Sequence, residues 1–249
     1  PCAAPAGVRA AARRAATILR ATSDRAPHLN CYGLHEWAML YTPPGAAPAH
    51  RHQKLPLRLS QAELNAVVEA HPVACTHFDA YRFFTPSAAP LNTATPTPTR
   101  QTQPALEQPG CVHATMDLFR YALKLWPWIP SELLADSLEI AISARVLDMR
   151  ASPYDLSEWA GERGGFDLAP VAIENEGGRR EYQREQSRLA QRAAPLRARV
   201  LGHYDAAIRR WDESSDGALA RRAASVRRRA SAPAVADGGI SSQGVAAQA

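Results

Sequence analysis

The stretch Cys111-Val-His-Ala-Thr-Met-Asp-Leu-Phe-Arg-Tyr-Ala-Leu-Lys-Leu-Trp126 decides the fold class. Its apolar side chains recur at the three- and four-residue spacing of one face of an α-helix, and Pro127 ends the pattern. A second helical pattern follows at once, with Ser131 as its N-cap, and continues to about Leu147. Two long amphipathic helices next to each other predict a mainly α-helical domain.

Shorter helices are predicted on the N-terminal side of this stretch. Residues 8–22 carry apolar side chains at helical spacing, and residues 31–41 form an apolar run that we expect to be a short buried helix. Ser60 and Glu63 form a capping box that opens a helix over 60–70. Three further segments are less regular: 55–59 and 168–173 are expected to be short strands, and 75–85 is either a strand or a short helix.

Two regions lack the pattern of a packed element. Pro, Thr, Gln and Asn dominate residues 86–110, so this segment should be a long loop lying over the site that its flanks create. Residues 179–212 have a charged helical pattern interrupted at Pro195, which predicts a kinked helix or a pair of helices. The expected organisation is an N-terminal helical region over 1–26, a core domain over 27–213 and a disordered basic tail over 214–249. Because the chain begins with Pro1 and not Met, we expect the N-terminal region to be truncated at its start.

Charge is unevenly distributed along the 249 residues. The formal net charge is +5, but residues 214–249 hold five arginines against two aspartates, which leaves only +2 for everything before them. The core domain is therefore close to neutral, and an extended phosphate-binding surface is not indicated. No apolar run reaches the roughly 20 residues of a membrane span, so no membrane partner is expected. The four cysteines form no CxxC pair, which favours a reducing, intracellular and most simply cytoplasmic location.

Histidines and carboxylates gather in one part of the sequence. Six of the eight histidines lie between His35 and His113, several of them close to an acidic residue. His113 and Asp117 are one helical turn apart and would share a face, and a strand would place His77 and Asp79 on one side. We expect one divalent ion, iron, zinc or manganese, bound by His35, His77, His113 and Asp117. The alternative is that each histidine is satisfied in the core or in a loop.

Neighbouring residues are candidates for catalysis and substrate binding. Asp79, Asp117 and Glu36 are the candidate catalytic carboxylates. Cys111, at an expected helix N-terminus, is a possible nucleophile if its thiol is not simply buried. Two aromatic rings, Trp37 and Tyr81, could stack on a planar substrate, unless they are part of the core. Two arginines, Arg82 and Arg120, could clamp an anionic substrate, unless they pair with aspartates.

Several long strings resemble one known family. They are Cys31-Tyr-Gly-Leu-His-Glu-Trp-Ala-Met39, Cys75-Thr-His-Phe-Asp-Ala-Tyr-Arg-Phe-Phe-Thr85, Glu107-Gln-Pro-Gly-Cys-Val-His-Ala-Thr-Met-Asp117, Pro130-Ser-Glu-Leu133 and Leu147-Asp-Met-Arg-Ala-Ser-Pro-Tyr-Asp-Leu156. Together they resemble an actinobacterial family commonly labelled 3-methyladenine DNA glycosylase, over residues 27–199. The Leu-Pro-Gly hairpin of the helix-hairpin-helix glycosylases does not occur in the sequence, so the resemblance is to a family of another type.

The resemblance implies base excision in DNA repair. A flipped base would then stack on rings such as Trp37 or Tyr81, and Asp79 or Asp117 would stabilise the sugar cation or activate water. The residues themselves suggest instead a metal-dependent enzyme acting on a small molecule, and a non-catalytic binding domain is the third alternative. The enzyme alternatives require His35, His77, Asp79, His113 and Asp117 to converge on one pocket beneath the 86–110 loop.

The charge distribution predicts weak binding to DNA. A chain ending at Glu213 should bind duplex DNA weakly and with a shallow dependence on salt, because few basic side chains outside the tail are free to contact phosphates. Fluorescence anisotropy across a salt series measures both quantities. Tight binding with a steep salt dependence would contradict this prediction.

Overall fold

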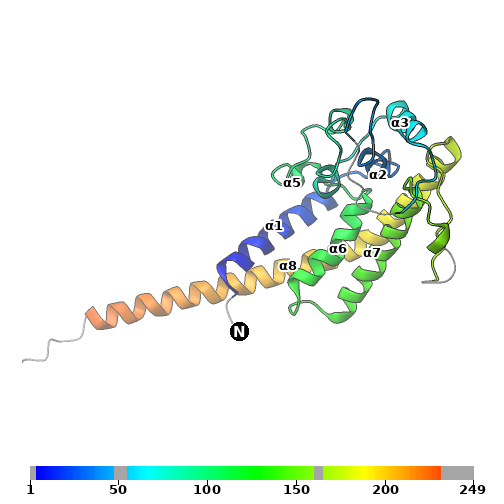
Figure 1. Cartoon of the computed structure of the whole chain (residues 1–249). Helices are drawn as coiled ribbons and strands as arrows, with labels where there is room; N and C mark the ends of the chain where they lie inside the picture. The colour runs from blue at the N-terminus through cyan, green and yellow to red at the C-terminus, as the bar shows by residue number, and fades with distance from the viewer. Residues whose placement is uncertain (1–3, 48–54, 160–164, 231–249) are drawn as a thin grey trace, which may run out of the picture. The chain divides into compact units, whose positions relative to one another are not determined.

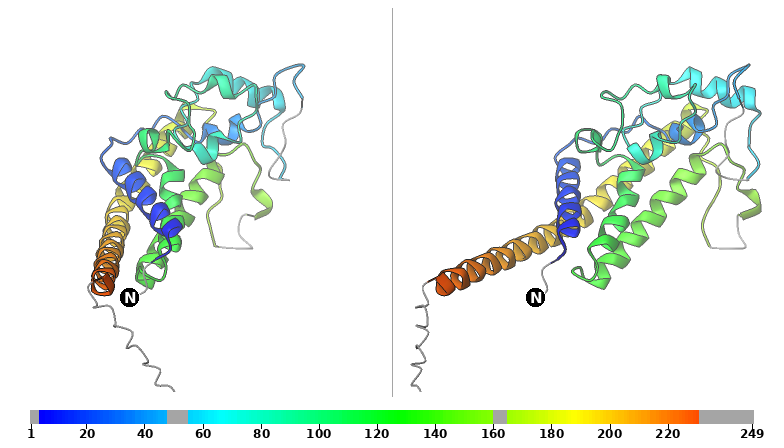
Figure 2. Two further views of the ribbon diagram at one scale, coloured as in Figure 1. Left: turned by 90° about the vertical axis from the view of Figure 1, so that its left-hand side faces the viewer. Right: turned by 60° about the vertical axis from the view of Figure 1, so that its left-hand side comes forward.

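Helices α6 (Val112–Leu125) and α7 (Ser131–Ala151) run side by side and form the hairpin that the sequence predicts (Figures 1 and 2). The apolar face of α6 is buried along its length, from Val112 to Leu125, and α7 buries its own apolar stripe. Pro127 follows the C-cap of α6 and cannot continue the helix, since it has no backbone N–H to donate. The hairpin is the frame on which the shorter elements are placed.

The computed structural model describes residues 4–47, 55–159 and 165–230, with 215–230 described by their backbone alone. One helical domain comprises Ala4–Ile208, and α8 (Glu176–Ala230) continues from Arg209 as part of a separate unit. The mainly α-helical class expected from the sequence is confirmed. Within this described part of the chain, no helix is both long and apolar enough to span a membrane.

The N-terminal helices follow the sequence pattern closely. Helix α1 (Ala6–Ser23) buries the apolar face predicted over 8–22, and α2 (Leu34–Ala38) is the short buried helix predicted within 31–41. Helix α3 (Gln61–Ala70) begins with the expected capping box. The remaining elements are single turns: α4 (Phe78–Tyr81), η1 (Ala89–Leu91), α5 (Gln103–Leu106) and η2 (Ser157–Trp159).

The predicted short strands over 55–59 and 168–173 are wrong. Within the described residues, β-pairing is limited to two isolated bridges, Leu57 with Tyr154 and Val73 with Asn92. Neither segment has a neighbouring extended chain long enough to form a ladder, so each stays extended without becoming a strand. The undecided segment 75–85 contains the short helix α4.

Side-chain hydrogen bonds, and not regular secondary structure, fix the position of the 86–110 segment. Asn92 accepts a hydrogen bond from the backbone N–H of Cys75 at 2.8 Å and donates one to the carbonyl of Cys75 at 3.1 Å. Arg25 donates to the carbonyls of Pro104 and Glu107 at 2.6 and 2.8 Å. These bonds satisfy backbone groups that a helix or sheet would otherwise pair. The segment is a loop as predicted, apart from η1 and α5, and it is anchored at both ends.

Helix α8 is longer and more continuous than the sequence suggests. It passes through Pro195 as one helix, so the prediction of a helix pair is wrong. It also continues over 214–230, where we expected no regular structure. Alanine and arginine have high helix propensity, and extending an existing helix avoids the cost of nucleation, so the helix does not need an apolar face there. The rest of the predicted tail, 231–249, lies outside the described residues.

The capping box of α3 should have a measurable effect on stability. The Ser60 side chain accepts a hydrogen bond from the backbone of Glu63, and Glu63 Oε2 accepts one from the backbone of Ser60 at 2.9 Å. Ser60→Ala removes the first of these bonds and should lower the free energy of unfolding by about 1 kcal/mol, measured by urea denaturation. Ser143→Ala, in the middle of exposed α7 surface, is the matched control and should leave stability unchanged or slightly higher. Equal effects at the two positions would argue against the cap.

Candidate functional site

Three imidazole rings lie in succession inside the domain. His113 of α6 meets His35 of α2 edge to face, with ring centroids 4.6 Å apart, and stacks on His77 at 5.3 Å on its other side. His77 is the N-cap residue of α4, which begins where the chain enters the interior. His35 and His77 are almost completely buried. Carboxylates flank this row at both ends and divide it into two groups of possible metal ligands.

The first group consists of His35, His113 and Asp148. His35 Nε2 lies 2.7 Å from Asp148 Oδ1, and one donor atom from each of the three residues lies within 4.8 Å of the others. Arg145 donates to the second oxygen of Asp148 at 2.9 Å. Cys31 Sγ lies 3.4 Å from Nδ1, the other ring nitrogen of His35. Asp148 therefore has both oxygens paired, although its side chain is fully buried.

Protonation differs between the two histidines of this group. Burial alone would lower the pKa of His35, but the Asp148 carboxylate outweighs it and holds that pKa well above its usual value. Burial acts against the charged form of Asp148 too, and His35 more than offsets it, so the pKa of Asp148 is lowered. Burial, followed by repulsion from His35, drives the pKa of His113 well below its usual value. These shifts favour the protonated form of His35 and the neutral form of His113.

The second group consists of His77, Glu107 and Asp117. His77 Nε2 lies 3.5 Å from Glu107 Oε2 and 3.3 Å from Asp117 Oδ2. Both nitrogens of His77 are buried and neither forms a hydrogen bond of good geometry within the described residues. Glu107 also accepts a hydrogen bond from Gln103 at 2.7 Å, so the 86–110 loop supplies this carboxylate and its support.

Electrostatics in the second group are set by burial and by the carboxylates. Burial lowers the pKa of His77, but the adjacent Asp117 and Glu107 raise it, and the net pKa is above the usual value. Burial raises the pKa of Glu107. Arg120 pairs with Asp117 and reaches Asp79 Oδ2 at 3.3 Å, so Asp79 belongs to the same network without touching His77.

A cavity of about 270 Å³ leads from the surface to His113. Glu36 lies on its wall, and burial, followed by repulsion from Asp148, raises the pKa of Glu36 to about 7. Asp79 and Arg82 line the same cavity and pair with each other at 2.9 Å. The other lining residues are Met39, Phe83, Arg145 and Tyr154.

No family model, curated protein or solved structure matches this chain. The chemistry available at the site is set by its own atoms: two donor groups for a cation, one neutral imidazole, and a carboxyl group that holds its proton near neutrality. A base and an acid with separated pKa values, facing one cavity, are the arrangement that proton transfer requires.

The three predicted histidines lie close together, but the predicted residues do not share one pocket or one ligand set. Of those expected to converge, only Asp79 and His113 line the cavity. His113 and Asp117 were expected to bind one ion together, and the structure places them in different groups. Their side chains start from one face of α6, but His113 turns toward α2 and α7 and Asp117 toward α4 and the loop. His77 and Asp79 would share a side only in a strand, and that condition is not met because helix α4 occupies this segment.

Sequence reasoning missed two carboxylates that complete the groups. Asp148 follows Ala141, Ala144 and Leu147 on the buried side of α7, and a carboxylate in that position is a signal of a buried partner. Glu107 stands four residues after Gln103, which supports it, but the surrounding loop composition hides it. Neither residue lies near a histidine in the sequence.

Three expected roles change in the structure. Trp37 is completely buried and donates from Nε1 to the carbonyl of Ala151 at 2.9 Å, so it is part of the core and cannot stack on a substrate. Tyr81 packs against Phe84 with centroids 5.0 Å apart and does not line the cavity. Cys111 is buried, which raises the pKa of its thiol, so the alternative of a simply buried cysteine holds and the thiol is not activated. Arg82 and Arg120 form the aspartate pairs that were the alternative.

The pair of His35 and Asp148 predicts a specific pH dependence of stability. Asp148→Asn leaves a buried imidazole without its charge partner and should lower the free energy of unfolding by about 3 kcal/mol. The raised pKa of His35 adds stability that is lost as pH rises through that pKa, and the lowered pKa of Asp148 adds stability that is lost as pH falls through it. The deficit of the variant should therefore be greatest between roughly pH 4 and 6.5 and smaller on either side.

Asp136→Asn is the matched control, since Asp136 is on the same helix and pairs with Arg199 at the surface. It should cost less than about 1 kcal/mol at every pH. Urea denaturation across pH measures both variants. A deficit for Asp148→Asn that does not vary with pH would mean that packing, and not the ion pair, explains the loss.

Proposed function

We propose that this chain is a metal-dependent enzyme acting on a small-molecule substrate. The ion is bound by His77, Glu107 and Asp117, and the substrate enters the cavity lined by Glu36 and His113. Iron, zinc and manganese are the ions suited to one imidazole and two carboxylates. Such an ion would supply a Lewis acid and lower the pKa of a bound water.

The observation that carries this proposal is the arrangement around His77. Two ligands of a tetrahedral zinc ion, each about 2.0 to 2.1 Å from the metal, are about 3.4 Å apart. His77 Nε2 lies 3.3 and 3.5 Å from its two carboxylate oxygens, and it forms no well-aligned hydrogen bond to either within the described residues. Burying an imidazole removes its hydrogen bonds to water, and here no hydrogen bond within the protein offsets that loss. A bound ion would provide the missing partner.

Charge balance also suits a divalent cation. Glu107 and Asp117 carry two negative charges in the interior, and Arg120 is shared between Asp117 and Asp79. With both carboxylates ionised, a protonated His77 would leave one net negative charge on the group, whereas a neutral His77 with an ion of charge +2 would leave none. Binding of the ion must therefore displace the proton of His77, which makes the affinity fall as pH decreases.

The cavity offers an acid and a base to a bound substrate. His113 is neutral, and its Nδ1 is buried without a hydrogen-bond partner among the described side chains, so it is available to accept a proton. Glu36 has a pKa of about 7 and carries a proton in part of the molecules at neutral pH. These two residues supply general acid and base groups next to the proposed metal ligands.

Base excision, which the family resemblance implies, is the second proposed function. What supports it is Glu36, a carboxyl group that can act as a general acid at neutral pH, together with the aromatic residues Phe83 and Tyr154 in the same cavity. The aspartates expected to act on the sugar are differently placed: Asp79 lines the cavity, whereas Asp117 is held by Arg120 and His77. A binding domain without catalysis is the remaining alternative.

Metal binding is the first test. The purified chain should bind about one equivalent of Zn²⁺ or Mn²⁺ with release of protons, because the ion competes with protons for the imidazole of His77. Isothermal titration calorimetry in buffers of different ionisation enthalpy measures the affinity and the proton release. His77→Ala should lower the affinity at least about a hundredfold, and His203→Ala, on a part of α8 remote from the site, should not change it.

Four outcomes would count against this assignment. Undiminished affinity in His77→Ala excludes the second group as the site, and loss in His35→Ala alone moves the ion to the first group. Absence of binding by zinc, manganese and ferrous ions removes the proposal altogether. Release of 3-methyladenine from alkylated DNA in the presence of a chelator would establish the second function in its place.

A further inference from the structure

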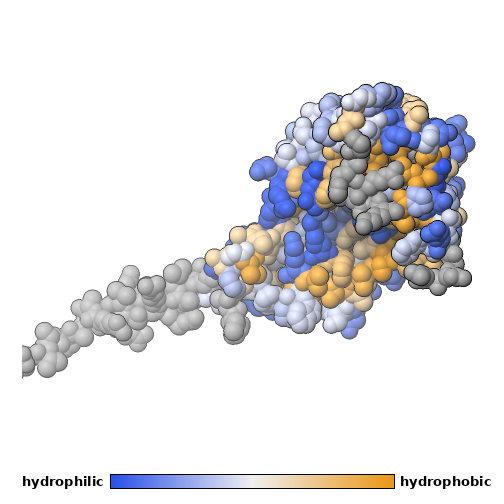
Figure 3. All heavy atoms as spheres, viewed as in Figure 1, coloured by the Kyte–Doolittle hydropathy of each residue, from blue (hydrophilic) through white to orange (hydrophobic). Residues whose placement is uncertain are grey.

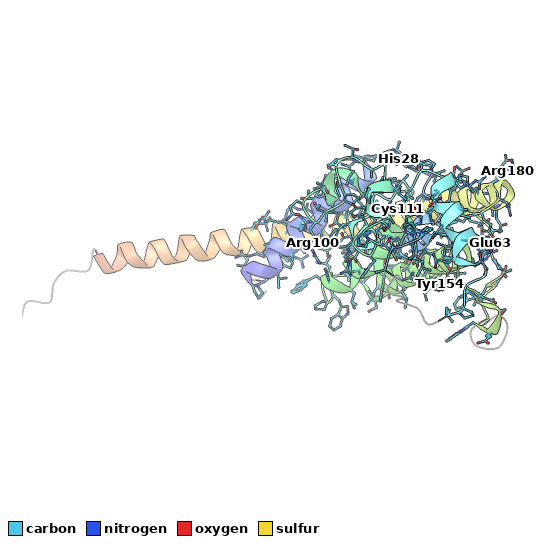
Figure 4. All side chains as sticks on the ribbon, turned by 45° about the horizontal axis from the view of Figure 1, so that its top comes forward. His28, Glu63, Arg100, Cys111, Tyr154 and Arg180 are labelled. Carbon is cyan, nitrogen blue, oxygen red and sulfur yellow. The ribbon has the colours of Figure 1, made fainter. Side chains whose placement is uncertain are left out.

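A second recess lies on the other side of Asp79 from the substrate cavity. It has a volume of about 150 Å³ and is lined by residues of α1, α4, α5 and α6 and by Arg100. Arg100 is labelled in Figure 4. Its lining residues include four cations and one carboxylate, Asp79. The cations are Arg14, Arg100, Arg120 and Lys124.

The recess carries more positive charge than the rest of the domain. The recess has a formal charge of +3, whereas residues 1–213 together carry +2. Hydrophilic side chains also gather over the region where α1, α5 and α6 meet (Figure 3). The remainder of this part of the chain is thus slightly negative, and the recess is the local exception.

Much of this charge is not neutralised by acidic partners. Arg14 donates to the carbonyl of Arg100 and to the side chain of Gln103, which are both neutral acceptors. The Arg100 guanidinium lies over the ring of Phe78, 5.4 Å from its centroid, and has no acidic partner among the described residues. Lys124 likewise pairs with no carboxylate in the described chain. Only Arg120 is committed to acidic side chains.

The recess is connected to the proposed metal ligands through one side chain. Arg120 contacts Asp117, which lies 3.3 Å from His77, and also reaches Asp79 at 3.3 Å. Asp79 lines both the recess and the substrate cavity. A group bound in the recess would therefore be connected to the proposed metal ligands through the ion pair of Arg120 with Asp117. The recess and the cavity also share Asp79 as a common wall.

We propose that this recess binds the phosphate group of a small phosphorylated substrate. A phosphate dianion carries two negative charges and offers several acceptor oxygens to guanidinium and ammonium donors. A carboxylate carries only one negative charge and would neutralise less of the positive charge in the recess. The cations surround one recess and do not form a stripe, which suits a terminal phosphate better than the backbone of a nucleic acid. This inference rests on the proposed function, since it assigns the recess to the same active site.

Phosphate binding by metal-free protein tests the inference without any enzymatic assay. Inorganic phosphate should bind to chelator-treated protein in calorimetry, and a mononucleotide should compete with it. Arg100→Ala and Lys124→Ala should each weaken binding about fivefold to tenfold, because each removes one charge-assisted contact. Arg188→Ala changes the net charge equally at an exposed position on α8 and should leave the affinity unchanged.

Both variants are surface substitutions, and an unchanged thermal transition would show that they fold. No phosphate binding, or binding that neither variant weakens, overturns the inference. A short single-stranded oligonucleotide that binds much more tightly than the mononucleotide, and loses its affinity in the same variants, overturns the small-molecule assignment in favour of nucleic acid. Zinc binding through His77 without phosphate binding would retain the proposed function and remove only this inference.

Discussion

The buried hydrogen bond between His35 and Asp148 is the contact on which the rest of the site depends. An ionised carboxylate without exposure to water costs several kcal/mol unless it is paired, so α2 and α7 must stay within hydrogen-bond distance of each other. Trp37 fixes the same two helices by its bond to the carbonyl of Ala151. Because α6 packs along α7, this contact also places His113 against the edge of His35. One ion pair thus sets the position of the whole row of imidazoles.

A protonated imidazole at one end of the row determines the state of the middle ring. His35 carries its charge because Asp148 is beside it, and that charge, added to burial, keeps His113 neutral. His77, at the other end, is also biased toward its protonated form by carboxylates. Of the three rings, His113 is the one that lines the cavity of about 270 Å³. Burial and the acidic partners thus favour positive charge on the two outer rings and disfavour it on the ring that lines the cavity.

The aspartates and arginines around the row separate the interior from the surface. Asp117 faces His77 and is paired with Arg120, whereas Asp79 binds both Arg120 and Arg82. The buried carboxylate of Asp117 and the half-buried one of Asp79 are therefore joined by a single guanidinium. Such a bridge lets the chain keep two carboxylates close to each other without direct repulsion. It also explains why two recesses of different charge can share one wall at Asp79.

The parts of this structure that could be predicted are those that local chemistry decides. The capping box at Ser60 and the apolar faces of α6 and α7 depend on residues within one or two turns, and both were recognised in the sequence. The partner of His35 was not, because Asp148 is 113 positions away and nothing near His35 points to it. A carboxylate on the buried side of a helix shows that a partner must exist, since its desolvation must be offset. Which residue provides that partner depends on how α2 and α7 pack, and packing follows from the apolar faces of several helices together. For that reason the histidines and acids could be recognised as a group, while their division into two sets of possible metal ligands required the fold.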